Sequence, residues 1–285
     1  MLYLFLTIIG GVIASLAYKA AAEMGCRRMH HLMVERAILV LGFAGLGIAL
    51  GGMTVTGEVI VVSSLAGMFL WVSRWALLKA LSIGHAGITF TLWKLSLAIP
   101  VLVSIFLWGE TPGLLQIVGL VLVPACLLLL RNREKNEAAT RKQIGFGKAL
   151  YPALLCAAAE GIFLCFFKWI DVHDLGASRN LFLFLYNVVV LAAITLATSS
   201  RGWSLPSRKE YLSGTVGGLG LIIGGYFGIL AVLQVSGIIF FPVASAGVLL
   251  LTVIFTPLIW QEKTTAAQWI GIALSVIAIV LVSST

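Results

Sequence analysis

Two ionisable side chains, Lys94 and Glu160, lie midway along apolar stretches that are long enough to cross a membrane. A charge at the centre of a bilayer costs about 2.5–3.5 kcal/mol on insertion scales, so such residues are expected to face a partner or a polar cavity. We expect Lys94 and Glu160 to lie at similar depth and to line one polar site, either as a solute-binding pair or as a purely structural one. Glu160 could also carry a proton. These residues suggest the binding of a polar solute within the membrane.

A third charged residue, Arg74, lies nearer the end of its apolar stretch. Its long side chain could reach the membrane surface, or it could join the same site. Trp71 lies within one turn of Arg74, and Phe90 and Trp93 flank Lys94. Such aromatic rings could hold the flat or apolar part of a solute, although they more commonly serve in packing. Weaker polar candidates for the site are Asn187 and Tyr226.

The sequence shows no arrangement of residues typical of an enzyme. His30 and His31 are expected in a loop, and His85 and His173 are solitary near the ends of apolar stretches. The four cysteines form no CxxC pair, and no metal-ligand spacing is present. We therefore expect no catalytic residues, no metal and no cofactor.

The composition is that of a membrane protein. Of the 285 residues, 60% are hydrophobic and 11% are charged, and the mean hydropathy is +1.08. A soluble domain needs more charge to cover its surface. Apolar runs of the length of a membrane span occur at 2–20, 32–50, 59–82, 84–107, 113–131, 149–170, 180–198, 212–235, 238–259 and 265–283. The sequence thus predicts an all-α polytopic membrane protein with ten transmembrane helices.

A block of residues recurs 152 positions later without a gap. Its first copy is Trp108, Glu110, Gln116, Gly119 and Leu122, and its second copy is Trp260, Glu262, Gln268, Gly271 and Leu274. Each half holds five apolar runs, and because five is odd the second half must enter the membrane inverted. We expect a five-helix repeat over 1–131, a cytoplasmic linker over 132–148 and an inverted five-helix repeat over 149–285.

The polar residues of this block have a structural interpretation. Glu110 and Glu262 each precede the start of a helix, where a carboxylate faces the positive end of the helix dipole. Thr265 and Gln268 form the pattern of a capping box, and Gln116 occupies the equivalent position in the first half. We favour this capping role over a role in solute binding.

Glycines mark places where helices are expected to approach closely. Gly220, Gly224 and Gly228 are spaced by four residues and share one helix face. This spacing is typical of tight helix packing in lipid. A sliding surface in a transport cycle is the functional alternative, and both roles are compatible.

The net charge of +8 is explained by topology rather than by nucleic-acid binding. Of the 19 Lys and Arg residues, all but Arg74, Lys94, Lys168 and Arg179 fall in or beside connections on one side. The positive-inside rule makes that side cytoplasmic, so both termini are expected on the outer face. Residues 2–18 are expected to form a mature helix rather than a signal peptide, because their positive charges follow the apolar run.

The repeated block resembles the drug/metabolite transporter superfamily, in particular the ten-span type built from two EamA repeats. The motif is Trp108-Gly109-Glu110 followed by Gln116-x-x-Gly119, and Trp260-Gln261-Glu262 followed by Gln268-x-x-Gly271. Gln261 departs from the usual glycine. The resemblance implies a central solute cavity, alternating access without ATP, and a place in the bacterial plasma (inner) membrane.

We therefore expect a secondary transporter of a small organic metabolite, such as an amino acid or another carboxylate-bearing solute, acting mainly in export. The alternatives are a flippase for a lipid-linked carrier and a scaffold that transports nothing. The expected partners are the solute and membrane lipid, with no nucleic acid. Proton coupling and a homodimer stay open.

Overall fold

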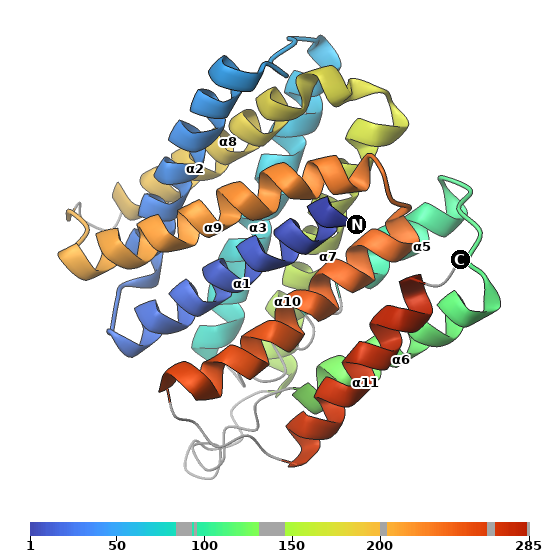
Figure 1. Cartoon of the computed structure of the whole chain (residues 1–285). Coiled ribbons are helices and arrows are strands. Elements are labelled where there is room, and N and C mark those ends of the chain that lie inside the picture. Colours follow the sequence, from blue (N-terminus) through green and yellow to red (C-terminus); the bar gives the residue numbers. More distant parts are fainter. Residues whose placement is uncertain (84–92, 94–95, 131–145, 200–203, 261–265, 284–285) are drawn as a thin grey trace. The chain divides into compact units, whose positions relative to one another are not determined.

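The computed structural model describes residues 1–83, 93, 96–130, 146–199, 204–260 and 266–283, and these residues form helices and short connections without a β-strand (Figure 1). The helices are α1 (Leu2–Glu23), α2 (Arg28–Leu50), α3 (Gly57–Ile83), α5 (Ala98–Phe106), α6 (Leu114–Leu130), α7 (Phe146–Val172), the 3-10 helix η1 (Leu175–Ser178), α8 (Arg179–Ser199), α9 (Arg208–Val232), α10 (Gly237–Trp260) and α11 (Ala266–Ser283).

Seven of the described helical segments are long and apolar enough to cross a membrane by length and composition. The protein is therefore an all-helical, multi-pass membrane protein, as predicted. Of the expected fourth span, 84–107, the described part includes only the nine-residue helix α5, and the apolar part of α11 is shorter than a full span. The count of ten spans stays a prediction.

The helices group into two compact units. Unit 1 consists of Met1–Trp71 and Phe166–Val235, and unit 2 consists of Val72–Cys165 and Ser236–Thr285. Each unit thus combines helices from both halves of the sequence, and α3 and α7 each contribute one end to each unit.

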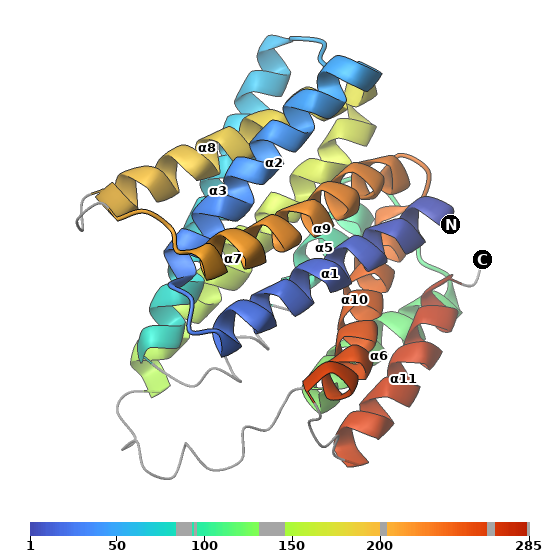
Figure 2. The same ribbon diagram turned by 60° about the vertical axis from the view of Figure 1, so that its left-hand side comes forward.

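In unit 1, α9 packs lengthwise against α1, and both views show the two helices side by side (Figure 1 and Figure 2). A Cβ on Gly220 would lie 2.8 Å from the carbonyl oxygen of Gly10 and 2.9 Å from the backbone nitrogen of Ala14. A Cβ on Gly224 would lie at 3.4 Å or more from its nearest neighbours. Gly220 therefore permits a contact between backbones that any larger residue would block. Gly228 is also buried.

Helix α9 also packs on α2, which in turn packs on α8. The core of this part of unit 1 is apolar and fully buried, with Leu39 and Phe43 on α2 and Phe182, Leu183 and Val190 on α8. The same two helices also carry polar side chains into the interior, which are described below with the candidate site.

In unit 2, α6 packs along α11, and α10 packs on α5, α6 and α11. Val282 of α11 lies against Gly119 of α6, where a Cβ would meet its backbone nitrogen at 2.9 Å. Gln116 accepts a hydrogen bond from the backbone N–H of Gly113 at 2.9 Å, which is one half of a capping box. The side chains of Glu262 and Gln268 lie outside the described residues.

Glu110 caps a helix that is distant from it in the sequence. Its carboxylate accepts hydrogen bonds from the backbone N–H groups of Gly237, at 2.9 Å, and Ile238, at 3.0 Å. These are the first residues of α10, so the negative charge lies at the N-terminus of α10. The sequence predicted a carboxylate at the dipole of the helix that follows Glu110; the contact with α10, 127 residues away, was not predicted.

Candidate functional site

Unit 2 contains a buried ion pair that joins α3 and α7. A terminal nitrogen (Nη2) of Arg74 lies 3.2 Å from Oε1 of Glu160, and the two side chains are 15% and 10% exposed. The hydroxyl of Ser73 donates to the other carboxylate oxygen of Glu160 at 2.7 Å. Both helices are apolar enough to cross a membrane. The pair therefore places two opposite charges, with a hydroxyl beside them, within an apolar helical body.

An aromatic ring covers the guanidinium of Arg74. The Cζ atom of Arg74 lies 5.1 Å from the centroid of the Trp93 ring, which is a cation–π distance. The Arg74 side chain is thus directed towards Glu160 and Trp93. Cys156, one turn before Glu160 on α7, lies 3.6 Å from the Ser73 hydroxyl. We call Ser73, Arg74, Trp93 and Glu160 the arginine–glutamate cluster.

The other residues predicted for the site are distributed differently. Lys94 and Phe90 lie outside the described residues, so the expected contact between Lys94 and Glu160 stays a prediction. Trp71 is partly buried and belongs to unit 1. Tyr226, also in unit 1, packs edge-on against Phe227 at 5.4 Å between ring centroids.

Asn187 belongs to a second polar cluster, in unit 1, which the sequence analysis missed. Its side-chain oxygen accepts from Arg36 at 2.8 Å, and its nitrogen donates to the carbonyl oxygen of Leu183 at 2.7 Å. Arg36 also lies 3.1 Å from the carboxylate of Glu35, and His31 lies one turn earlier on α2. Glu35 and Asn187 are fully buried. We call His31, Glu35, Arg36 and Asn187 the α2 cluster.

Two expectations about this segment were wrong. His30 and His31 were expected in a loop and Arg36 beside one, but α2 begins at Arg28 and buries all three side chains. The preceding connection is short because Gly25, with φ +69°, reverses the chain directly after α1. The run His-His-x-x-x-Glu-Arg, with His and Glu four residues apart, was the available signal, since residues at this spacing share one face of a helix.

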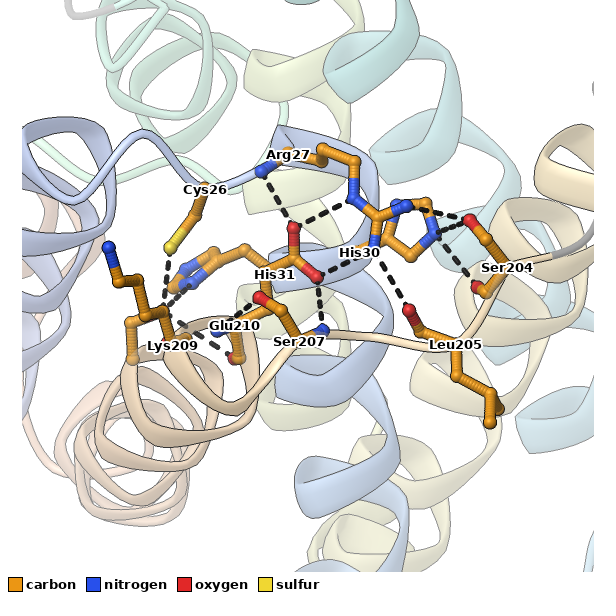
Figure 3. A network of polar contacts seen from close by, with 10 residues as sticks. Cys26, Arg27, His30, His31, Ser204, Leu205, Ser207, Lys209 and Glu210 are labelled. Atoms are coloured by element: carbon orange, nitrogen blue, oxygen red, sulfur yellow. Dashed lines mark hydrogen bonds and ion pairs between the residues drawn. The ribbon is translucent and has the colours of Figure 1, made fainter.

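A polar network at the N-terminal ends of α2 and α9 fastens these helices together (Figure 3). Arg27 donates to both carboxylate oxygens of Glu210, at 2.9 and 3.0 Å, and the pKa of its guanidinium is raised by that hydrogen bond. Glu210 also forms a capping box with Ser207 at the start of α9. His30 contacts the hydroxyl and the carbonyl oxygen of Ser204, each at 3.0 Å.

No metal site is formed by His, Cys, Asp or Glu side chains within the described part of the chain. The arginine–glutamate cluster instead offers a cation, a carboxylate, a hydroxyl and an aromatic face. These groups can bind an ionic or zwitterionic organic molecule by exchanging one partner of the ion pair.

Comparison with known proteins finds a similarity in fold alone. No family model matches the chain. No curated protein matches it either. A solved structure described as "Crystal structure of protein" superposes with a TM-score of 0.80 at 17% sequence identity, covering 99% of this chain and 95% of that chain. It is among 29 matching chains of known structure.

Proposed function

We propose that the protein is a secondary transporter for a small organic solute that carries a carboxylate, such as an amino acid. The observation that carries this proposal is the Arg74–Glu160 pair. Ionisable groups within membrane-spanning segments are costly, and they commonly mark the path of a solute or an ion. A solute carboxylate would displace Glu160 from Arg74, while the Trp93 ring would cover the apolar part of the solute.

The proposal includes ten spans arranged as two inverted repeats of the drug/metabolite transporter type, with residues 1–131 and 149–285 as the halves. Support comes from contacts between connections that this topology places on one side. In unit 1, the inner connections meet through Arg27 and Glu210, and the outer ones through a hydrogen bond from Asn180 to Gly52. In unit 2, Glu110 and Gly237 join two outer connections.

Thermal-shift screening of the purified full-length protein tests the solute class. The panel contains amino acids, dicarboxylates and, as the contrasting set, uncharged sugars and amines. A solute present at 100 times its Kd stabilises the folded state by about 2.7 kcal/mol, which is readily measured as a rise in Tm. We expect at least one carboxylate-bearing solute to raise the Tm, and Arg74→Gln to abolish that rise.

The matched control is Arg208→Gln, which removes the same charge from an exposed position at the start of α9. It should keep the ligand-induced rise in Tm. Uptake of the radiolabelled solute into proteoliposomes then tests whether the protein transports it. In the bacterial cell, we expect the protein to export this solute across the inner membrane. A protein that binds no member of the panel and moves none of them contradicts the proposal and favours a scaffold; stabilisation by polyprenyl phosphate alone favours a flippase.

A further inference from the structure

The α2 cluster contains an acidic side chain with few hydrogen-bond donors. Glu35 is fully buried, and its nearest cation, Arg36, divides its guanidinium between the carboxylate, at 3.1 Å, and Asn187, at 2.8 Å. Buried carboxylates normally accept several hydrogen bonds. Within the described residues, however, neither oxygen of Glu35 has a hydrogen bond of good geometry. The carboxylate can therefore accept a further donor.

The contact with Ser213 indicates which nitrogen of His31 carries the proton. The Ser213 hydroxyl donates to the carbonyl oxygen of Lys209 at 2.9 Å, which uses its one hydrogen. With the hydroxyl hydrogen on the Lys209 carbonyl, the Nδ1 atom of His31, which lies 2.9 Å from the same hydroxyl oxygen, acts as the donor. In the neutral ring, Nε2 is consequently an acceptor without a hydrogen.

This acceptor faces a second acceptor. Nε2 of His31 lies 3.9 Å from Oε2 of Glu35, and their side chains are 2% and 0% exposed. Neither atom has a hydrogen-bond partner among the described residues. One proton between these two atoms would satisfy both, once a side-chain adjustment brings them to about 2.8 Å, the usual length of a charge-assisted hydrogen bond.

The surrounding charges permit one added proton. Glu35 and Arg36 balance each other, so the cluster is neutral with a neutral His31 and carries a single positive charge when protonated. On α9, the charge of Glu210 is matched by Arg27. Among the described residues, two further titratable groups lie near the site: Tyr18 on α1, whose ring centroid is 4.9 Å from that of His31, and Cys26, whose sulfur lies 3.9 Å from the Ser213 hydroxyl.

We propose that His31 and Glu35 form a proton-binding site, in which one proton bridges Nε2 and the carboxylate while Ser213 holds the ring. The site lies one to two turns from the N-terminus of α2. Its His31 lies beside the network that joins α2 to α9 (Figure 3). If the protein is the transporter proposed above, this proton is its coupling ion. That use rests on the proposed function, whereas the proton site itself does not.

Nuclear magnetic resonance of the full-length protein labelled with 15N-histidine tests the site without any transport assay. Correlations between the ring nitrogens and the carbon-bound ring protons report the tautomer of each of the four histidines. The variant His31→Gln then identifies which resonances belong to His31. We expect neutral His31 to carry its proton on Nδ1 and to become doubly protonated on acidification. Glu35→Gln should lower the proton affinity of His31 at least tenfold.

Two further variants complete this experiment. Ser213→Ala removes the hydroxyl that fixes the ring, and should let the neutral proton move to Nε2. The matched control is Glu58→Gln, which removes a carboxylate lying 3.3 Å from the exposed His173 and should leave the titration of His31 unchanged. Neutral His31 with its proton on Nε2 in the unmodified protein, or an unchanged titration in Glu35→Gln, would overturn the proposal.

Proteoliposomes test the coupling separately. The probes are a 14C-labelled mixture of amino acids and dicarboxylates and an imposed pH gradient. We expect the gradient to accelerate uptake at least fivefold in the unmodified protein and not in His31→Gln, which should retain solute exchange. An uptake rate in the unmodified protein that does not change with the pH gradient would overturn the coupling role of the proton site. If no solute moves in any variant, the proposed function fails, while the resonance experiment still decides the proton site.

Discussion

At the scale of single residues, the Arg74–Glu160 pair makes a prediction about stability. Removing one partner of a buried ion pair leaves the other charge uncompensated, at a cost of about 3–5 kcal/mol. Arg74→Met should therefore lower the free energy of unfolding by about 3 kcal/mol, since Glu160 keeps only its hydrogen bond from Ser73 among the contacts described above. The measurement is reversible denaturation in mixed micelles.

A double-mutant cycle separates this pairing from lost packing. Combining Arg74→Met with Glu160→Gln should recover about 2 kcal/mol of the summed losses, because no charge is then left alone. Strict additivity of the two single changes would show that the two charges do not interact in the folded protein. If Glu160→Gln leaves the rise in Tm with every solute unchanged, Glu160 is not part of the binding site.

Glu110 gives a second prediction at this scale. Glu110→Ala leaves the backbone N–H groups of Gly237 and Ile238 without their carboxylate, and loss of a helix cap costs about 0.5–2 kcal/mol. We expect a loss of about 1–2 kcal/mol in the free energy of unfolding. Glu23→Ala, at an exposed position at the end of α1, should change stability by less than about 0.5 kcal/mol. Equal effects of the two changes would contradict a capping role.

Single residues were the least predictable level from sequence. The depth of Glu160 in an apolar run predicted a partner, but the run could not show that Arg74 would supply it from another helix. Glu35 and Arg36 were hidden because they lie near the beginning of a hydrophobic run, where charges normally indicate a loop. Hydropathy describes the average of a segment, whereas burial of a charge depends on the particular neighbour that pairs with it.

At the scale of elements, α1 and α9 give a prediction with an internal control. A methyl group on Gly220 would press on the backbone of Gly10 and Ala14, so the helices must separate, and overpacking of this kind costs about 1–3 kcal/mol. Gly220→Ala should therefore lower stability by about 2 kcal/mol. Gly224→Ala, one turn later with room of 3.4 Å or more, should lower it much less.

The order of these two effects is the decisive result. Thermal unfolding in one detergent compares the variants directly, and a larger loss for Gly224→Ala would contradict the packing described for α1 and α9. Sequence spacing alone predicted that Gly220, Gly224 and Gly228 share a face, yet it could not rank them. Ranking requires the position of the partner helix, and that partner, α1, is about 200 residues away in the sequence.

At the scale of the whole molecule, helix class and approximate helix positions followed from hydropathy, because lipid forces each apolar run to satisfy its backbone hydrogen bonds within a helix. The grouping of helices did not follow. The sequence repeat divides the chain near 131–148, while the compact units take segments from both sides of that point. Similarity between two segments indicates that they have similar local structure. Compactness depends instead on which segments pack together, so the division by sequence repeat and the division into compact units need not coincide.

Topology is the prediction that concerns the whole chain, and its critical point is the fourth span. Helix α5 has nine residues, which extend about 14 Å at 1.5 Å per residue, whereas a bilayer core is about 30 Å thick. A turn at Ser96 and Leu97 precedes α5, so crossing depends on residues 84–95 supplying the rest of the span and carrying Lys94 through the membrane. Alkaline phosphatase, active only outside the inner membrane, can be fused after Pro112, after residue 140 and after Thr285.

We expect activity from the fusions after Pro112 and Thr285, and none from the fusion after residue 140. If 84–107 enters and leaves on the same side, all three results reverse: Pro112 and Thr285 become cytoplasmic and residue 140 becomes external. The reversed pattern would leave nine spans and halves that are not inverted repeats of five. Lys94 would then need no buried partner, and the solute site would depend on Arg74 and Glu160 without it.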